Sequence, residues 1–398
     1  MSYYILPNSN YHNILNKINV SFTDKDIIGA SNSMLNNYIN KIKLLINTYS
    51  DRWDNFKKIT NPYEYIHTVV PNAKNAVCRY KPLSRSFFKM IELSAIHSLI
   101  NELPDNCKTF HLAEGPGGFI EATLLLRDNP DDIYYGMTLI DNDNINIPGW
   151  RKSHNFIKNN PNVIIETGKD NTGNIMNVEN LIHCYDKYRG TMDLITADGG
   201  FDFSIDFNQQ EIMSSKLIFA QICFAISMQK IGGNFILKVF DLFTQSSIDM
   251  IFLLCCVYKQ VYITKPNTSR YANSEKYIVC KDFILNNADV AAFITSIIPA
   301  YYQIESDSKL ERVLNCNIPY LFTSKLEELN SIFGQQQIEN IASTINLIEN
   351  NRNDKIDNLK KANINKCMIW CQKYNLPYNN LQPTNIFLSG GRLSDEDM

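Results

Sequence analysis

Short apolar runs alternate with longer runs of helical spacing between about residue 76 and residue 285. Apolar runs bounded by turn residues predict buried strands, and apolar residues recurring every three or four positions predict helices. This alternation favours a doubly wound, mainly parallel sheet, so the predicted fold class is α/β and Rossmann-like. The predicted strands are Thr109–Ala113, Ile133–Ile140, Asn162–Glu166, Met192–Ala197, Gly233–Phe240, Gln260–Lys265 and Lys276–Lys281, and the predicted helices between them are Phe119–Arg127, Val178–Tyr188, Gln210–Gln229 and Gln245–Val257.

The flanks of this alternating region have a different, more helical pattern. Residues 1–75 are rich in Asn, Ile and Tyr and have helical spacing at Ser33–Thr48. The C-terminal part has helical spacing at Ala288–Ile298, Lys325–Asn350 and Asp354–Tyr374. We therefore predict a helical N-terminal extension over 1–75, an α/β domain over 76–288, a helical region over 289–388 and a disordered tail over 389–398.

Composition narrows the class of protein only slightly. The net charge of -3 argues against a globally basic nucleic-acid-binding protein, although the stretch 74–89 holds five basic residues and no acid. The ten cysteines lack paired metal spacing, so we expect reduced thiols and no metal site. The longest apolar runs, Leu217–Met228 and Met250–Tyr258, are shorter than the ~20 residues of a membrane span, and no membrane association is expected.

A glycine-rich turn follows the first predicted strand, in the sequence HLAEGPGGFIEA over 111–122. In a parallel sheet this turn lies at the carboxyl edge, where backbone N–H groups at a helix N-terminus attract anions. The turn matches neither the dinucleotide fingerprint nor the P-loop, and it has no lysine for a triphosphate. A carboxylate suits it better, and S-adenosylmethionine presents one, so a methyltransferase is the first hypothesis. The alternative is a tight structural turn.

Four charged residues stand out around this turn. Lys238 lies inside an apolar strand, and charged residues are seldom buried unpaired. Asp198 and Lys238 both fall at carboxyl ends of strands and should converge on one cleft, with Lys89 and Glu275 completing the set. A single such lysine is more often a salt-bridge partner or a strand residue whose ammonium reaches solvent.

The set Lys89, Asp198, Lys238 and Glu275, together with AEGPGGF (113–119), resembles the K-D-K-E tetrad of FtsJ-type RNA ribose 2′-O-methyltransferases. Within that family the chain is most similar to the cap-specific mRNA enzymes. The resemblance covers roughly residues 57–285 and rests on NPYE (61–64), SRSFFKM (84–90), EGPGGF (114–119), GMTL (136–139), TADGGF (196–201), QEI (210–212), FDLFT (240–244) and KPNTSRYANSEKYIVC (265–280).

The resemblance implies S-adenosyl-L-methionine as cofactor and the tetrad as the catalytic residues, with Lys238 as general base. To accept a proton the lysine must be neutral, which burial and the cation Lys89 favour. Asn174 stands where the family has Asp, and His111 stands where many members have an acid; we interpret His111 as a packed strand residue. The implied cofactor-binding residues are Ser84, Ala113, Glu114, Gly115, Pro116, Gly117, Gly118, Phe119, Asn174, Ile175 and Asp198.

The resemblance also implies capped mRNA as substrate, no metal, and other capping or transcription enzymes as further partners. Arg85 and Arg270 are candidates for phosphate contacts, which position RNA without reading its sequence. The N-terminal extension is a candidate cap- or RNA-binding segment. The implied RNA-binding residues are Lys57, Arg85, Asn208, Gln209, Gln210, Arg270 and Asn273.

The sequence offers two candidates for the methylated nucleotide, the first and the second transcribed nucleotide. FDLFT and SRYANSEKYIVC resemble enzymes that modify the first transcribed nucleotide, which is our prediction, whereas HLAEGPG and DNTGNIM resemble those that modify the second. An rRNA or tRNA ribose methyltransferase and a non-catalytic RNA-binding scaffold are the alternatives. The Asn- and Ile-rich composition is compatible with a large DNA virus, so we expect a cytoplasmic location, such as a viral replication site, or a virion, with a nuclear location left open.

Overall fold

The computed structural model describes residues 2–8, 13–141, 143–144, 147–200 and 207–381. The predicted tail over 389–398 lies outside them. The chain forms two compact units, one of Met1–Tyr49 with Pro82–Ala342 and the other of Ser50–Lys81 with Ser343–Met398. These units differ from the predicted segments, because the first 49 residues belong with the sheet rather than to a separate extension.

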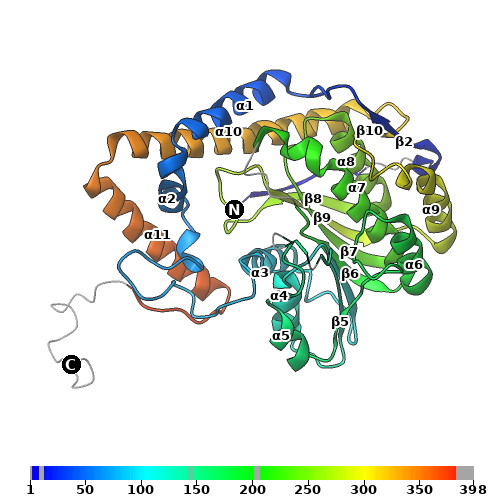
Figure 1. Cartoon of the computed structure of the whole chain (residues 1–398), viewed down its shortest axis with the longest axis horizontal. Coiled ribbons are helices and arrows are strands. Elements are labelled where there is room, and N and C mark those ends of the chain that lie inside the picture. The colour runs from blue at the N-terminus through cyan, green and yellow to red at the C-terminus, as the bar shows by residue number, and fades with distance from the viewer. Residues whose placement is uncertain (1, 9–12, 142, 145–146, 201–206, 382–398) are drawn as a thin grey trace. The chain divides into compact units, whose positions relative to one another are not determined.

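An eight-stranded sheet organises the first unit (Figure 1). Its order is β1-β8-β9-β7-β6-β3-β4-β5. The neighbours β5, β4, β3, β6 and β7 pair in parallel, whereas β9 is antiparallel to both β7 and β8, and β1 is antiparallel to β8. The mainly parallel α/β fold predicted from the sequence is thus confirmed. The strands are β1 Ser2–Ile5, β3 Lys108–Leu112, β4 Ile133–Met137, β5 Val163–Ile165, β6 Met192–Ala197, β7 Gln229–Val239, β8 Tyr258–Lys265 and β9 Lys276–Phe283.

The sheet reverses its winding direction between β3 and β6. The chain runs from β3 outward to β4 and β5, then returns to β6 on the other side of β3 and continues to β7. Ligands of open α/β sheets bind at the carboxyl ends of strands where this reversal occurs. Ala113 directly follows β3, and Asp198 directly follows β6, so both lie at this point.

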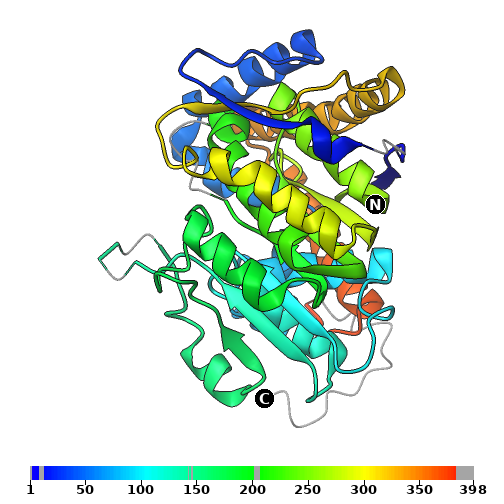
Figure 2. The ribbon, with the colours of Figure 1, turned by 90° about the vertical axis from the view of Figure 1, so that its right-hand side faces the viewer.

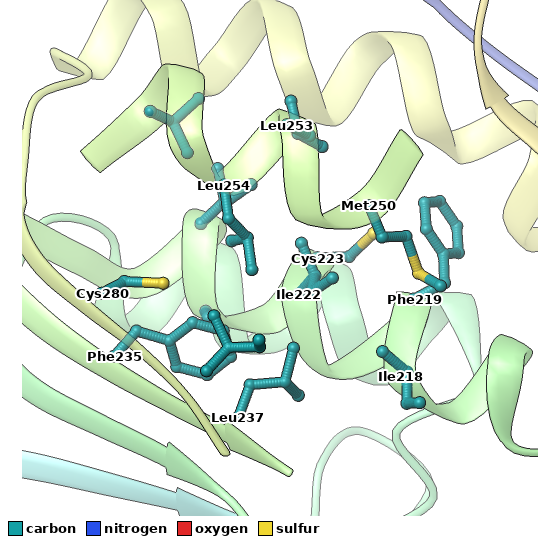
Figure 3. Close-up of a cluster of buried hydrophobic side chains, with 14 of the residues drawn as sticks. Ile218, Phe219, Ile222, Cys223, Phe235, Leu237, Met250, Leu253, Leu254 and Cys280 are labelled. Atoms are coloured by element: carbon teal, nitrogen blue, oxygen red, sulfur yellow. The ribbon is translucent and has the colours of Figure 1, made fainter. Parts of the chain in front are cut away.

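Helices cover both faces of the sheet. On one face, Ile120 of α4, Tyr134 of β4 and Val163 of β5 form a core with Phe156 of α5. The other face holds the larger core, to which α6, α7, α8 and α9 contribute, and Figure 2 shows α6, α7 and α9 side by side. Figure 3 shows side chains of α7, α8, β7 and β9 gathered in this core. The helices of this region of the chain are α3 Ser86–His97, α4 Gly118–Arg127, α5 His154–Asn159, α6 Val178–Tyr188, α7 Gln210–Met228, α8 Gln245–Val257 and α9 Asn287–Tyr301.

Helix α7 is the most apolar long helix of the described segments. By length and hydropathy alone it could cross a membrane, but 83% of its most apolar window is buried inside the protein. The core helix of a globular protein can have the same length and composition, so these properties are weak evidence for a membrane segment. Its apolar residues are accounted for by the core between α8 and the sheet.

The flanking segments contain strands as well as the predicted helices. In the first unit, β2 (Ile18–Thr23) pairs antiparallel with β10 (Lys309–Leu314), and α1 (Ser33–Thr48) packs on α10 through Ile39 and Ile338. Helix α10 (Tyr320–Asn350) continues into the second unit. That unit also holds α2 (Ser50–Thr60), the short helix η2 (Glu64–Ile66) and α11 (Asn353–Lys373), whose Asn363 donates to Ile59 O at 2.8 Å.

Candidate active site

Lys89 and Glu275 form a buried ion pair. Lys89 lies in α3, which is buried along most of its length, and Glu275 precedes β9. Lys89 Nζ lies 2.8 Å from both carboxylate oxygens of Glu275, and the two side chains are 8% and 10% exposed. Ser269 donates its hydroxyl hydrogen to Glu275 Oε1 at 2.8 Å. Glu275 therefore positions Lys89.

Lys238 and Asp198 form the second pair, at the carboxyl ends of β7 and β6. Lys238 Nζ donates to Asp198 O at 2.6 Å and lies 3.3 Å from Asp198 Oδ1. Tyr277, the cross-strand neighbour of Lys238 in β9, donates to the same Asp198 Oδ1 at 2.7 Å. A side chain at Gly200 would approach Lys238 Nζ to 3.1 Å, so glycine keeps the space beside this amine open. The geometry fixes the amine of Lys238 against one carboxylate.

Burial and charge act together at this cluster. Burial alone would raise the pKa of Glu275, but the Lys89 and Lys238 ammonium groups hold it well below its ordinary value. Glu275 is thus a carboxylate at neutral pH, and its charge offsets the cost of burying Lys89. By contrast, burial and the nearby charge of Asp198 raise the pKa of Glu114 well above its ordinary value.

A second set of contacts holds the loop that carries Glu275. Glu92, three positions after Lys89 on the same face of α3, accepts hydrogen bonds from Asn267 N at 2.9 Å and from Thr268 N at 3.1 Å. Lys265 Nζ donates to Asn273 O and Glu275 O, each at 2.8 Å. Residues 265–275, called the 265–275 loop below, are therefore fastened at both ends and to α3.

The glycine turn at 115–118 lies directly beside the start of α3. A side chain at Gly118 would lie 2.1 Å from Ser86 Oγ and 3.1 Å from Ser84 Oγ, so only glycine permits this approach. Gly117 has a φ of 108°, a conformation that glycine adopts without strain. The structure thus brings Ser84 to the turn, as the predicted cofactor site requires.

One part of the anion-binding prediction is wrong. Glu114 Oε1 accepts hydrogen bonds from Phe119 N at 2.5 Å and Ile120 N at 3.2 Å, so the chain's own carboxyl group caps these N–H groups at the start of α4. These two N–H groups are therefore not the free donors that the sequence predicted. The sequence did not indicate this, because Glu114 precedes the turn and its side chain folds back across it.

The 173–175 segment reaches the same edge of the sheet. A side chain at Gly173 would lie 2.0 Å from Thr138 O, and one at Gly115 would lie 3.1 Å from Thr138 Oγ1, so Thr138 at the end of β4 joins both segments. The Asn174 side chain is engaged within the protein: its Nδ2 donates to Glu305 at 2.8 Å, and its Oδ1 accepts from Met176 N at 2.9 Å. Ile175 is 4% exposed and packs in the core.

The predicted RNA-binding residues belong to several different elements. Arg85 donates to Thr268 O at 3.4 Å and Asn273 accepts from Lys265, so both border the 265–275 loop, which also carries Arg270. Gln209 is exposed at the start of α7, whereas Gln210 is buried and accepts from Ser274 Oγ at 3.0 Å. Asn208, in the short helix η3 (Phe207–Gln209), is half-buried. Lys57 belongs to the second unit, where it pairs with Asp54.

Sequence reasoning missed several residues that shape this site. Tyr277, Ser269 and Glu92 each contact a tetrad residue or its loop, yet each resembles an ordinary core or loop residue in the sequence. Glu211 is another: its buried carboxylate accepts from Phe243 N at 2.9 Å and Thr244 N at 2.7 Å, which fixes the turn after β7. His111 is fully buried and bonded to Thr109 and Thr196, as expected of a packed strand residue.

The residues at the switch point fit S-adenosylmethionine. Two buried donors there have no hydrogen-bond partner among the described residues: Gln221 Nε2, whose side chain contacts Gly199, and Trp150 Nε1, whose ring lies beside Gly117. They are available to acceptor groups of a ligand. The Asp198 carboxylate supplies the negative charge that suits a sulfonium cation. Among the described residues, no group of three or more His, Cys, Asp or Glu side chains is arranged to hold a metal ion.

The fold and this site define a Rossmann-like methyltransferase. The model of the family "FtsJ-like methyltransferase" matches residues 82–283, just over half of the chain, so the chain belongs to this family. This confirms the family predicted from the sequence. FtsJ-like methyltransferases use S-adenosylmethionine, which supports the predicted cofactor.

Three curated relatives illustrate the similarity. Cap-specific mRNA (nucleoside-2′-O-)-methyltransferase 1 of Mus musculus is 35% identical over 189 residues, 46% of this chain and 22% of the relative. Cap-specific mRNA (nucleoside-2′-O-)-methyltransferase 2 of Drosophila melanogaster is 30% identical over 187 residues, which make up 46% of this chain and 27% of the relative. The Mus musculus methyltransferase 2 is 28% identical over 363 residues, 86% of this chain and 45% of the relative. The chain spans less than half the length of each.

Proposed function

We propose that this protein transfers a methyl group from S-adenosylmethionine to a ribose 2′-hydroxyl near the 5′ end of capped mRNA. The observation that carries the proposal is the pairing of Lys238 with Asp198 and of Lys89 with Glu275 beside the glycine turn. The names of the relatives, which are cap-specific 2′-O-methyltransferases of both types, support the substrate class.

The protein's task in this reaction is to align the hydroxyl and remove its proton. Bound S-adenosylmethionine supplies a methyl group that its sulfonium charge has already activated. In its neutral form, Lys238 Nζ would accept the 2′-hydroxyl proton as the ribose oxygen bonds to the methyl carbon. The O–H bond and the methyl–sulfur bond would then break, the amine would become an ammonium, and the cofactor would leave as a neutral thioether. Asp198, which contacts Nζ through both its backbone and side-chain oxygens, stabilises that ammonium and orients the amine.

Lys89 and Glu275 have a different role in the proposal. The Lys89 ammonium is held by both Glu275 oxygens and lies 5.7 Å from the centre of the Tyr277 ring, the same tyrosine that contacts Asp198. The two pairs are thereby linked through one aromatic side chain. A fixed cation at this place orients the ribose and its oxygen, so that the amine of Lys238 meets the hydroxyl in line.

The position of the methyl group is tested by mass spectrometry. Capped and uncapped RNA of one sequence, and an rRNA or tRNA fragment, are treated with the protein and isotopically labelled cofactor. We expect label on the first transcribed nucleotide of capped RNA only, and none with Lys238→Ala. Label on the second nucleotide would show that the protein modifies the second transcribed nucleotide instead. Label on uncapped RNA alone would favour an rRNA or tRNA ribose methyltransferase. Binding of cofactor and RNA without any transfer would favour the scaffold alternative.

A further inference from the structure

The turn that follows β7 is fastened by two helices from the flanks of the chain. Residues 240–244, called the 240–244 turn below, directly follow β7, which carries Lys238 and ends at Val239. Helices α1 and α10 both supply side chains that contact this turn, and both lie outside residues 82–283, which match the family model. The position of the turn therefore depends on segments beyond the matched methyltransferase region.

Lys43 of α1 forms a buried ion pair with Asp241 of the turn. Lys43 Nζ lies 2.8 Å from Asp241 Oδ2, and the two side chains are 4% and 13% exposed. Burial alone would raise the pKa of Asp241, but the Lys43 and Lys276 ammonium groups hold it below its ordinary value. Asp241 is thus a carboxylate at neutral pH. Loss of Lys43 would leave this buried charge without its hydrogen-bonded partner, which strongly destabilises the local structure.

Two further contacts from the same flanks hold the next residues of the turn. Phe243 O accepts hydrogen bonds from Ala30 N at 2.7 Å and from Ser31 N at 3.2 Å, just before α1 begins. Asn330 of α10 donates its Nδ2 hydrogen to Leu242 O at 2.8 Å. Three consecutive residues of the turn, 241 to 243, are therefore each held by a segment that is far away in sequence.

Phe240 connects this turn to the general base. Lys238 Nζ lies 6.0 Å from the centre of the Phe240 ring. A side chain at Gly200 would meet both residues, Lys238 Nζ at 3.1 Å and Phe240 Cζ at 3.5 Å, so the ring and the amine border the same space. The pairing of β7 with β9 ends at Val239. Beyond that point the 240–244 turn, rather than this pairing, sets the position of the ring.

We propose that Lys43 is a positioning residue for the general base, because it holds the 240–244 turn in the place where Phe240 covers the amine of Lys238. The inference rests on the proposed function, since that function makes Lys238 the base. Lys43 itself does not touch Lys238 and acts through Asp241 and Phe240. Such an indirect effect on turnover is physically reasonable, because a 1 Å displacement at a reacting group can lower a rate about 10²-fold.

The first measurement does not depend on catalysis. The full-length chain is treated with a limiting amount of acetic anhydride, and peptide mass spectrometry gives the acetylation rate of Lys238 relative to the exposed Lys259. Labelling of a covered amine follows the fraction of time for which its cover is open. We expect Lys238 to react at least about tenfold faster in Lys43→Met, which removes the ion pair and keeps an apolar stem.

A second variant and a control accompany this measurement. Asn330→Ala removes only the hydrogen bond to Leu242 and should raise the rate about threefold. It carries the test if Lys43→Met does not fold. The matched control is Arg127→Met, which breaks a buried ion pair with Asp132 at the amino end of β4, the opposite edge of the sheet. This control should acetylate Lys238 at the wild-type rate.

The second measurement is kcat on capped RNA, divided by the fraction of chains that bind S-adenosylmethionine in calorimetry, so that unfolded chains do not count. We expect Lys43→Met to lower kcat about tenfold with the cofactor KM changed less than twofold, and Arg127→Met to match wild type. In a Phe240→Leu background the effect of Lys43→Met should shrink, because both substitutions disturb the same contact.

Several results would overturn the inference. They are a wild-type acetylation rate of Lys238 in both Lys43→Met and Asn330→Ala, an equal increase in the control, an unchanged kcat in folded Lys43→Met, and full additivity with Phe240→Leu. If the wild-type protein transfers no methyl group to any RNA, the proposed function fails, whereas the acetylation rates still decide whether Lys43 positions Lys238.

Discussion

Tyr277 donates its hydroxyl hydrogen to Asp198 Oδ1 at 2.7 Å, the oxygen that lies 3.3 Å from the amine of Lys238. The tyrosine is fully buried, so the bond lies away from water and holds the carboxylate in one orientation. The carboxylate in turn orients the amine. Tyr277 is thus a positioning residue, which acts on the reaction through Asp198.

Tyr277→Phe removes this hydrogen bond without removing the ring. We expect kcat to fall about tenfold with KM little changed, because one buried hydrogen bond to a charged group contributes about 1.5–3 kcal/mol. Steady-state kinetics on capped RNA measure both constants. The matched control is Tyr258→Phe, which deletes a buried hydroxyl bonded to Gln229 in the core. Equal effects of the two substitutions on kcat would show that Tyr277 has only a structural role.

Lys238→Arg tests the general base. A guanidinium stays protonated and cannot accept the hydroxyl proton, so turnover should fall by at least about 10²–10⁴-fold. Lys281→Arg makes the same change in the neighbouring strand β9, where Lys281 pairs with Glu102, and should keep near-normal turnover. Calorimetry should show unchanged cofactor affinity in both variants. Near-normal turnover of Lys238→Arg would place the base elsewhere.

Glu275→Gln leaves the Lys89 ammonium buried without its counter-ion. Breaking a buried ion pair on one side costs about 3–5 kcal/mol of unfolding free energy. Glu102→Gln, which breaks the pair with Lys281 at a side chain 48% exposed, should cost less than about 1 kcal/mol. Urea unfolding measures both values. A cost for Glu275→Gln no larger than for the control would contradict the charged state assigned to this pair.

Gly117→Val tests the cofactor turn. The φ of 108° makes any side chain there strained, so the variant should lose stability as well as affinity for S-adenosylmethionine. Gly232→Val separates the two effects, because Gly232 has a φ of 80° and open space where a side chain would lie. We expect at least tenfold weaker cofactor binding by calorimetry for Gly117→Val only. If both variants bind the cofactor as wild type does, the turn is purely structural.

His97 makes folding sensitive to acid. Burial, together with the charge of Lys281, lowers the pKa of His97 to about 4, and its Nε2 lies 2.8 Å from Thr264 Oγ1. Because the unfolded chain binds the proton with a pKa of about 6.5, stability is full above that pH and falls as the pH drops towards 4. The loss is on the order of 3 kcal/mol.

His97→Gln keeps a side chain that can bond Thr264 and removes the titration. Its unfolding free energy should fall less steeply than that of wild type between pH 6.5 and 4. His154→Gln, at an exposed residue of α5, is the control and should follow wild type. Parallel curves for wild type and His97→Gln would contradict the assignment.

The regular part of the fold could be predicted from the sequence because its apolar pattern is local. Strand Met192–Ala197 and helices Val178–Tyr188 and Gln245–Val257 have the predicted bounds. Helix α3 was not predicted, because residues 87–94 are buried on every side of the helix and their apolar residues therefore do not gather on one face. Strands β1, β2 and β10 were missed for another reason: each is short, and each is stabilised by a partner far away in sequence.

Asp198 and Lys238 could be predicted because charged residues at strand ends in an apolar sheet are conspicuous, whereas Lys89 and Glu275 were assigned to the tetrad through the family resemblance. Tyr277 could not, because a tyrosine in an apolar strand resembles a packing residue until the register of β7 and β9 sets it opposite Lys238. The capping of α4 by Glu114 depends on a side-chain direction that spacing does not encode. Such contacts follow from tertiary geometry alone.

The strand pairings at the edges of the first unit have a consequence for protein synthesis. Ser2 of β1 pairs with Lys265 of β8, and Thr23 of β2 pairs with Lys309 of β10. A ribosome releases β1 and β2 long before their partners, so Leu6, 2% exposed in the folded chain, stays uncovered during most of translation. We therefore expect folding of this unit to finish late, after residue 309 emerges, and nascent chains stalled earlier to depend on chaperones.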